Sequence, residues 1–331
     1  MVVPPLDKKP KVAYPRVMTE NFPNIVGQDK AKARLSFYID KYPHSSFVPN
    51  LLFLAPRGCG KTTLAKAFAK NLASFDKATG EPKDYLEFNC AQIKNVKHFF
   101  NSIVIPHVRD KEVTILFDEA SELPLDVQMV LLTILNPNDE RKNVFAFEDE
   151  VFVFDFTKQT FLFATTEAQK LFHALIDRLV RVDLEEYSFS HLAEILAKKL
   201  IGVTFEDGLL QEISSVLRGN GRQAQLMAND IRSFLSTKRS KHFSRLDWNK
   251  LKTSLGINPL GLNAVEIQIL KIIKERGART LTNLSAVTGL SRECLQRDYE
   301  MYIQKAGLME IVVAKGRSLT TKGAAYINAL K

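Results

Sequence analysis

The feature that most constrains this chain is a short glycine-containing run between an apolar segment and a helical pattern. The apolar residues 51–54 are followed by Ala55, Pro56, Arg57, Gly58, Cys59, Gly60, Lys61 and Thr62. This run closely matches the G-x-x-x-x-G-K-[ST] pattern, in which glycines let successive backbone N–H groups point at phosphate oxygens. Ala55 replaces the usual first glycine, and its methyl group is small enough to be tolerated. The run therefore predicts a strand, a phosphate-binding loop and a helix whose positive dipole end faces the phosphates.

The last residues of this run have defined roles in phosphate sites. Lys61 is expected to contact the β- and γ-phosphates of ATP, and the Thr62 hydroxyl to ligate Mg²⁺. A second apolar run, residues 113–117, ends in Asp118 and Glu119. We expect Asp118 to hold Mg²⁺, commonly through water, and Glu119 to polarise the attacking water. Because both acids are present, the sequence predicts ATP hydrolysis rather than nucleotide binding alone.

Apolar runs alternate with helical patterns through the first half of the chain. Strands are predicted at residues 50–55, 113–117 and 160–164, and helices at 62–72 and 124–135. This alternation is typical of an α/β fold with a parallel sheet covered by helices on both faces. From about Tyr187 the strand signal ends, and helices are predicted at residues 188–200, 207–217 and 224–235.

The C-terminal part has the pattern of a winged helix. Helices are predicted at residues 264–274, 282–287 and 292–305, and strands at 309–314 and 318–321, with the wing loop at Lys315, Gly316 and Arg317. We therefore predict four regions along the chain. They are an N-terminal tail (1–20), a large ATPase domain (21–183, with a β-hairpin insert at about 143–156), a small all-α lid domain (184–255) and a winged-helix DNA-binding domain (256–331).

The charge of the chain is concentrated toward its C-terminus. The 331 residues carry a net charge of +9, and residues 217–254 hold nine Lys and Arg against two acidic residues. A basic C-terminal half indicates a polyanionic partner such as DNA, although a solvated surface would have the same composition. Winged helices also bind proteins, so both kinds of partner stay open. The candidate phosphate contacts are Arg292, Arg297, Lys315, Arg317 and Lys322.

Cysteine usage and hydropathy indicate a compartment. The three cysteines are widely scattered and show no zinc-binding spacing, which favours a reducing environment. Apolar runs stay well short of the roughly 18 residues that a membrane-spanning helix needs. The first residues lack the apolar core of a signal peptide. We therefore expect a cytoplasmic protein with no membrane partner.

These segments, in their order and spacing, resemble an AAA+ ATPase. Residues 21–28 resemble the family's adenine-contacting segment, and residues 161–166 resemble its sensor 1, with Thr166 as the polar residue. The resemblance implies that Arg178 is an arginine finger acting on the neighbouring subunit, and that Arg222 is sensor 2. The residues that it assigns to the nucleotide are Ile25, Val26, Pro56, Arg57, Gly58, Cys59, Gly60, Lys61, Thr62, Thr63, Tyr187 and Arg222. Those assigned to catalysis are Glu119, Lys61, Asp118, Arg178 and Thr166.

Within this class the chain resembles the RuvB family of Holliday-junction branch-migration motors. The resemblance rests on the Ala-Thr-Thr of sensor 1, the hairpin insert and the terminal winged helix. It implies a ring, expected to be a homo-hexamer, that moves branched or duplex DNA together with a RuvA-like protein. Departures from the family pattern are Ala120, Ser121 and Glu122 after the paired acids, Glu167 after the two threonines, and Ile176.

The hairpin insert holds five phenylalanines and has two interpretations. Some of Val144, Phe145, Ala146 and Phe147 could dock the RuvA-like partner, because exposed apolar surface usually marks a contact. Alternatively, the aromatic rings pack on their own domain. The sequence favours neither interpretation.

Two other functions are compatible with part of the pattern. A clamp-loader or helicase-loader ATPase of DNA replication would share the phosphate site, but such proteins usually end in a helical collar. An origin-binding initiator would share the winged helix, and it would read DNA sequence rather than branching.

Overall fold

The computed structural model describes residues 21–75 and 81–330. The predicted N-terminal tail, residues 1–20, lies outside the described residues. The chain divides into two compact units, Met1–Tyr187 and Ser188–Lys331. This division falls close to the predicted start of the lid, and the four predicted domain boundaries stay predictions.

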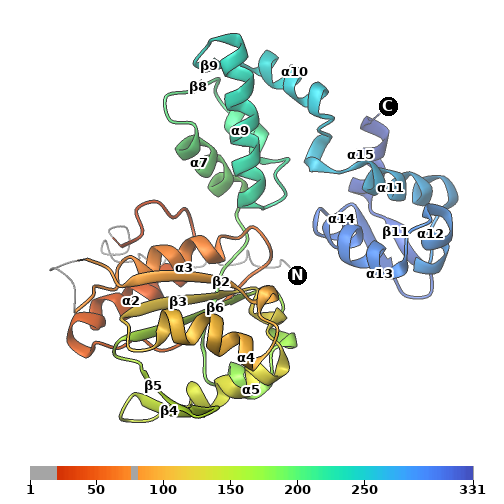
Figure 1. The fold of residues 1–331 in the computed structure, drawn as a ribbon. Coiled ribbons are helices and arrows are strands. Elements are labelled where there is room, and N and C mark those ends of the chain that lie inside the picture. Colours follow the sequence, from red (N-terminus) through yellow and green to blue (C-terminus); the bar gives the residue numbers. More distant parts are fainter. Residues whose placement is uncertain (1–20, 76–80, 331) are drawn as a thin grey trace, which may run out of the picture. The chain divides into compact units, whose positions relative to one another are not determined.

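The first unit contains a five-stranded parallel sheet (Figure 1). Its strand order is β2-β3-β6-β1-β7, and all four strand pairs are parallel. The strands are β1 (Leu51–Leu54), β2 (Asp84–Asn89), β3 (Val113–Asp118), β6 (Gln159–Thr165) and β7 (Val180–Asp183). Because the strands are parallel, the loops that follow β1, β3 and β6 meet at one edge of the sheet.

Helices cover both faces of this sheet. Successive residues of a strand point to opposite faces, so Ile115 and Phe117 enter one apolar cluster while Leu116 enters the other. Both clusters are deeply buried, which explains why these strands are almost continuously apolar in sequence. The helices are α2 (Asp29–Ser45), α3 (Lys61–Ala69), α4 (Val96–Phe99), α5 (Leu125–Ile134) and α6 (His173–Ile176), with a π-helix, η2, at Phe100–Val108. Three 3₁₀ turns, η1 (Cys90–Gln92), η3 (Ala120–Glu122) and η4 (Ala168–Lys170), complete the unit, together with an antiparallel hairpin of β4 (Lys142–Phe147) and β5 (Glu150–Asp155).

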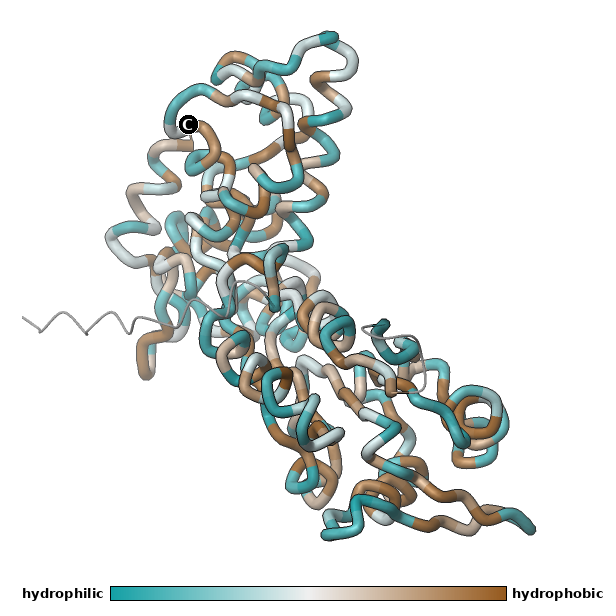
Figure 2. The backbone as a smooth tube through the Cα atoms, turned by 90° about the vertical axis from the view of Figure 1, so that its left-hand side faces the viewer, coloured by the Kyte–Doolittle hydropathy of each residue, from teal (hydrophilic) through white to brown (hydrophobic). Residues whose placement is uncertain are grey.

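The second unit begins with a helical region, which we call the lid. It contains α7 (Phe189–Lys199), α8 (Leu209–Ser214), α9 (Gly221–Lys238) and α10 (Arg245–Leu255). The two-residue strands β8 (Thr204–Phe205) and β9 (His242–Phe243) pair in parallel. Figure 2 shows apolar and polar residues alternating along the helices, as expected of amphipathic helices with one buried face.

The remainder of the second unit has winged-helix elements. A 3₁₀ turn, η5 (Pro259–Gly261), leads into α11 (Ala264–Arg276) and α12 (Leu281–Thr288). The third predicted helix is built of α13 (Arg292–Cys294), the π-helix η6 (Leu295–Glu300) and α14 (Met301–Lys305). Strands β10 (Met309–Val312) and β11 (Gly316–Leu319) form the wing, and α15 (Thr321–Ala329) ends the described chain.

The wing loop of the structure lies slightly earlier in the chain than predicted. The residues between β10 and β11 are 313–315, whereas Gly316 and Arg317 already belong to β11. The backbone of Arg317 explains the shift, because its N–H donates to the Arg279 carbonyl (2.7 Å) and its own carbonyl accepts from Arg279 (3.0 Å). Those two bonds hold residue 317 in an extended conformation.

A search of residues 21–75 and 81–330 finds no helix with the length and apolar character needed to cross a membrane.

Candidate nucleotide-binding site

The phosphate loop lies between the end of β1 and the start of α3. Gly58 and Gly60 adopt positive φ angles of 80° and 89°, a region that glycine enters without steric cost. At Gly60 a side chain would also collide, since a Cβ atom there would lie 2.7 Å from the Tyr187 hydroxyl. The glycines are therefore required for the curve of the loop, and the predicted nucleotide residue Tyr187 does lie against the loop.

Lys61, the first residue of α3, bends back over the loop. Its Nζ donates to the carbonyl oxygens of Ala55 (2.8 Å) and Pro56 (3.2 Å). The positive charge is thus placed at the loop itself, where a phosphate group would need it. The loop residues Pro56 and Arg57 are exposed, as is Thr63 in the first turn of α3, whereas Cys59 is buried.

Thr62 and Asp118 are in direct contact. The Thr62 hydroxyl donates to Oδ2 of Asp118 at 2.9 Å, which joins the first turn of α3 to the end of β3. Hydroxyl and carboxylate oxygens are the ligands that Mg²⁺ prefers in proteins, so the two residues fit a magnesium site beside the loop. This contact is consistent with the sequence-based prediction that both residues hold Mg²⁺.

Glu119 follows Asp118 with an unusual backbone conformation. Its φ angle is 54°, in the left-handed region that costs a non-glycine residue about 1–2 kcal/mol. Its N–H donates to Oδ1 of Asp118 at 3.0 Å, and its side chain is exposed. The turn therefore keeps the Glu119 carboxylate in solvent beside the Thr62–Asp118 pair.

The predicted sensor residue Thr166 lies directly after β6. Register pairs Asp118 with Ala164, so Thr166 lies two residues beyond the acid on the neighbouring strand. Thr165 is buried and its hydroxyl accepts from the Glu167 N–H (3.0 Å), whereas Thr166 is exposed. Thr166 is thus the one of the two threonines that faces solvent at this edge.

Sequence reasoning missed Gln28. Its side chain donates to the carbonyls of Glu185 (2.7 Å) and Cys59 (3.3 Å) and accepts from the Glu185 N–H (2.9 Å). Gln28 therefore links the segment before α2, the phosphate loop and the segment after β7. Burial raises the pKa of Tyr187, and a hydrogen bond with Gln28 opposes that shift. The only sequence signal was the position of Gln28 at the end of the stretch 21–28.

Two other predicted nucleotide residues lie in that same stretch. Val26 is buried and Ile25 is partly buried, and Ile25 packs against the apolar cluster that contains Phe53 and Leu64. They form the apolar wall of this part of the unit.

Arg178 is held by its own unit. Its guanidinium donates to the carbonyls of Leu132 (3.0 Å) and Ala174 (2.7 Å) and to Oδ1 of Asn136 (3.2 Å). These contacts place it at the C-terminal end of α5. Arg222 belongs to the second unit, where it is exposed in the first turn of α9, and the Asn220 side chain accepts its backbone N–H (2.9 Å).

Glu122 and Glu167, two acidic residues that depart from the family pattern, both lie close to Lys170. Nζ of Lys170 lies 2.8 Å from Glu167 and 3.7 Å from Glu122. The three residues link the segments that follow β3 and β6 next to the paired acids. The exposed pairs are expected to contribute little stability.

The hairpin buries its aromatic rings. Phe147 and Phe145 stack on Phe100 of η2, at centroid distances of 4.3 and 5.5 Å. Phe152 and Phe154 of the return strand are 2% exposed. Of the two interpretations of the hairpin, the contacts of Phe145 and Phe147 favour packing on their own domain over docking of a partner, because pairing in the hairpin turns these rings toward η2. The outward face consists of Val144, Ala146, Val151 and Val153.

The basic candidates of the winged helix differ in their surroundings. Arg317 is turned inward, since its guanidinium pairs with Glu300 at 2.7 and 3.0 Å and the two side chains are 12% and 3% exposed. It is therefore not placed to contact DNA. Lys322 donates to the Ala306 carbonyl (2.7 Å) and Arg297 pairs with Asp298 (2.9 Å), both at the surface. Arg292 and Lys315 are exposed.

Comparison with known proteins agrees with this arrangement. Residues 51–187 match the family described as "ATPase family associated with various cellular activities (AAA)", and residues 259–328 match the RuvB C-terminal winged helix domain. The chain is similar to the Holliday junction branch migration complex subunit RuvB of Campylobacter jejuni subsp. doylei, at 26% identity over 91% of this chain and 88% of that protein. The RuvB subunit of Ehrlichia canis is 27% identical over 91% of this chain and 90% of its own length. The solved structure of the Thermotoga maritima RuvB Holliday junction branch migration motor superimposes with a TM-score of 0.72 at 22% identity, over 93% of this chain and 96% of that one.

The sheet order, the phosphate loop and the two acids at the end of β3 define an AAA ATPase domain, here joined to a winged helix. Two family models match its two ends, and full-length relatives align over nine-tenths of it. The chain belongs to the RuvB family. The predicted fold class and family are confirmed.

Proposed function

We propose that this chain is an ATP-driven motor that moves the branch point of Holliday junctions, working as a ring expected to be a homo-hexamer. The observation that carries the proposal is the combination of an AAA ATPase unit with the winged helix of the RuvB family in one chain. Relatives that align over 91% of this chain are named as subunits of the Holliday junction branch migration complex.

The phosphate loop and the paired acids would perform the hydrolysis. Thr62 and Asp118 would hold Mg²⁺, which supplies charge neutralisation for the phosphates. The Lys61 ammonium would bind the phosphate oxygens, and the exposed Glu119 carboxylate would take a proton from the attacking water. The backbone N–H groups around Gly58 and Gly60 would orient the chain of phosphates.

Three further residues would complete the site. Thr166 would orient the attacking water from the end of β6. Arg178 would act on the site of the neighbouring subunit, which requires it to exchange at least part of its hydrogen bonds at the end of α5. Arg222 would report the nucleotide state to the lid.

DNA contact is assigned to the exposed cations of the winged helix. Arg292 lies in α13, whose N-cap is Ser291, and Lys315 lies in the wing loop. Arg297 and Lys322 add positive charge at the surface. A motor needs a grip that is independent of sequence, and contacts between cations and backbone phosphates supply it.

The partner surface is assigned to the outward face of the hairpin. Val144, Val151 and Val153 are 60%, 60% and 49% exposed, which is unusual for three valines of one hairpin. Acidic residues of the turn are paired, Glu148 with Lys97 (3.2 Å) and Glu150 with Arg109. The face is therefore mainly aliphatic, as a RuvA-like protein would need for an apolar contact.

A synthetic four-way junction tests this function. We expect ATP-dependent migration of the junction, stimulated by a RuvA-like protein, and no comparable displacement of a linear duplex of the same sequence. ATP hydrolysis with no movement of the junction in either condition would contradict the proposal. It would favour a clamp-loader or helicase-loader function, which loading of a clamp or helicase onto DNA would then test.

A further inference from the structure

The loop between α8 and α9 contacts the winged helix through one arginine. Arg218 forms a forked ion pair with Glu266, in which Nη2 and Nη1 lie 2.6 and 3.4 Å from the two carboxylate oxygens. Glu266 lies in the first turn of α11 and its side chain is 0% exposed. Arg218 itself has a φ angle of 58°, so the loop turns sharply in order to deliver this side chain.

The same guanidinium also lies on an aromatic ring. Its central carbon is 3.7 Å from the centroid of the Tyr302 ring, on α14. The Tyr302 hydroxyl donates to the Leu260 carbonyl at 2.5 Å, and the Tyr326 hydroxyl of α15 donates to the Pro259 carbonyl at 2.8 Å. Three helices of the winged helix therefore hold both Arg218 and the segment that leaves the lid.

The segment that connects the lid to α11 also comes very close to this loop, at Gly261. Gly261 has a φ angle of 69°, and a Cβ atom there would lie 2.1 Å from the Val216 carbonyl oxygen. This close approach is possible only for glycine. We call Arg218, Glu266, Tyr302 and Gly261 together the Arg218 joint.

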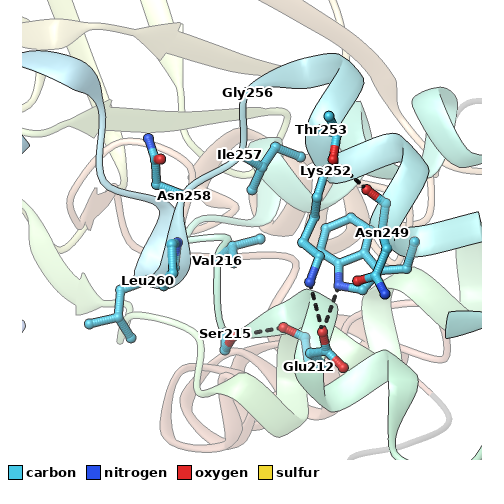
Figure 3. Close-up of a pocket in the computed structure, with 12 residues that line it drawn as sticks. Glu212, Ser215, Val216, Asn249, Lys252, Thr253, Gly256, Ile257, Asn258 and Leu260 are labelled. Atoms are coloured by element: carbon cyan, nitrogen blue, oxygen red, sulfur yellow. Dashed lines mark hydrogen bonds and ion pairs between the residues drawn. The ribbon is translucent and has the colours of Figure 1, made fainter. Parts of the chain in front are cut away.

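The remainder of the connection is loosely packed. A cavity of about 720 Å³ lies between the lid and residues 256–260 (Figure 3). On its lid side the Glu212 carboxylate accepts from Trp248 Nε1 (2.9 Å) and Lys252 Nζ (3.2 Å), so its charge is satisfied within the lid. All three residues belong to the lid. The Arg218 joint therefore provides the firm attachment.

We propose that Arg218 is a positioning residue that fixes the winged helix to the lid, so that the two move as one rigid lever. A guanidinium suits this role because it combines a planar two-bond fork with stacking on an aromatic ring, which together fix its direction. A lysine could satisfy the charge of Glu266 without fixing the angle.

The test has to avoid a buried unpaired charge. Removing Arg218 alone would leave the Glu266 carboxylate buried without its partner, and the winged helix could unfold for that reason. The double variant Arg218→Met, Glu266→Gln keeps the side-chain volumes and an oxygen that still accepts the Asn263 N–H (2.8 Å). A matched control is Arg232→Met, because Arg232 contacts only lid residues, the Lys199 carbonyl (2.7 Å) and Asn229 (3.1 Å).

A distance measurement by electron spin resonance reads the joint directly. Nitroxide labels are attached through Ser236→Cys and Lys271→Cys, at exposed sites of α9 and α11. The background is Cys294→Ser, which leaves only the buried Cys59 and Cys90. We expect a single narrow distance peak for the full chain and for the Arg232→Met control, and loss of that peak in the double variant. A broad distribution in the parent chain, or an unchanged peak in the double variant, would overturn the proposal. If circular dichroism shows the double variant unfolded, Tyr302→Leu is used instead, because it removes the ring beneath the guanidinium and the hydroxyl bond to Leu260 while leaving the ion pair intact. It is expected to broaden the peak, whereas Tyr302→Phe, which loses only the hydroxyl bond, is expected to keep it narrow.

Coupling of hydrolysis to movement is the second readout, and it rests on the function proposed above. We expect the double variant to keep the basal ATPase rate while base pairs migrated per ATP fall by at least about fivefold, the lower end of typical coupling energies. A parallel loss of ATPase and migration would instead assign Arg218 a structural role. If the parent chain itself fails to move junctions, the proposed function fails, and the distance measurement still decides the joint.

Discussion

At the scale of single residues, the nucleotide site forms where the segments at the ends of β1 and β3 lie side by side. The contact between Thr62 and Asp118 follows from a parallel sheet, because Asp118 directly follows one buried strand and Thr62 follows the phosphate loop at the end of another. Gln28 could not be predicted, because its main partner Glu185 is 157 residues away along the chain. The inward placement of Arg317 could not be predicted for the same reason, since its partner Glu300 belongs to a different element.

Glu119 is expected to carry the proton transfer of hydrolysis. Glu119→Gln should lower the steady-state ATPase rate by about 10²–10⁴-fold, the usual size of general-base catalysis. Nucleotide binding should persist, because the contacts of Lys61, Thr62 and Asp118 are unaffected. The checks are steady-state hydrolysis and binding of a labelled nucleotide, with Glu122→Gln, an acid three residues further on, as the control. Equal hydrolysis rates in the parent and the Glu119 variant would exclude this role.

Lys83 gives the first unit an unusual dependence on pH. It is 3% exposed, and burial lowers its pKa to about 8, although Glu112 and Asp155 oppose the shift. In the unfolded chain a lysine titrates near pKa ~10.4. Between these values the unfolded state binds more protons than the folded state, so the free energy of unfolding rises with pH.

The variant Lys83→Met isolates this effect. Between pH 8 and pH 10 the parent should gain stability relative to the variant, by up to roughly 3 kcal/mol over the full titration. Urea unfolding of both proteins at pH 7, 8, 9 and 10 measures the difference. Parallel stability curves would show that Lys83 keeps its ordinary pKa.

At the scale of elements, the buried central strands could be predicted from the sequence, whereas the edge strand β2 and the helix α10 could not. β1, β3 and β6 are continuous apolar runs because both of their faces are covered. β2 was missed because it is an edge strand with mixed burial. α10 was missed because its region is rich in lysine and arginine, although Ser244 and Asp247 form a capping box that marks its start.

The two faces of the hairpin are expected to have different roles. One packs on its own domain, and the other contacts the partner. Phe147→Ser should lower the free energy of unfolding by about 2–3 kcal/mol, because its ring stacks on Phe100 but is only half-buried. Val144→Ser, on the outward face, should change stability by less than about 0.5 kcal/mol. Thermal unfolding compares the two. Val144→Asp should in turn weaken binding of the RuvA-like partner, and a stable Phe147→Ser variant that has lost that binding would reverse the assignment of the faces.

Two basic residues of the wing, Lys315 and Arg317, give a second pair of contrasting variants. Lys315→Ala should weaken DNA binding and reduce its dependence on salt by about one phosphate contact. Arg317→Ala should instead destabilise the winged helix by roughly 3–5 kcal/mol, because it leaves the buried Glu300 carboxylate unpaired. DNA affinity at several salt concentrations and urea unfolding distinguish the two effects. A change in DNA affinity alone on replacing Arg317 would contradict its inward placement.

At the scale of the whole molecule, the proposed motor depends on two linked movements. Hydrolysis at the phosphate loop has to change the lid, and the lid has to move the winged helix that holds DNA. The sequence predicted the phosphate loop and the winged helix from their motifs. It could not predict the connection, because Arg218, Glu266 and Tyr302 meet only in the folded second unit.

The most direct test of this account is junction migration by two lysine variants of α3. Lys61→Ala removes the ammonium of the phosphate loop, whereas Lys66→Ala removes a surface lysine one turn further along the same helix. We expect ATP-driven movement of a four-way junction to fall by at least about 10²-fold in the first variant, the size expected for loss of a positioned charge. It should stay near the parent rate in the second variant. Migration that persists in Lys61→Ala at the parent rate would contradict the claim that this site drives the DNA.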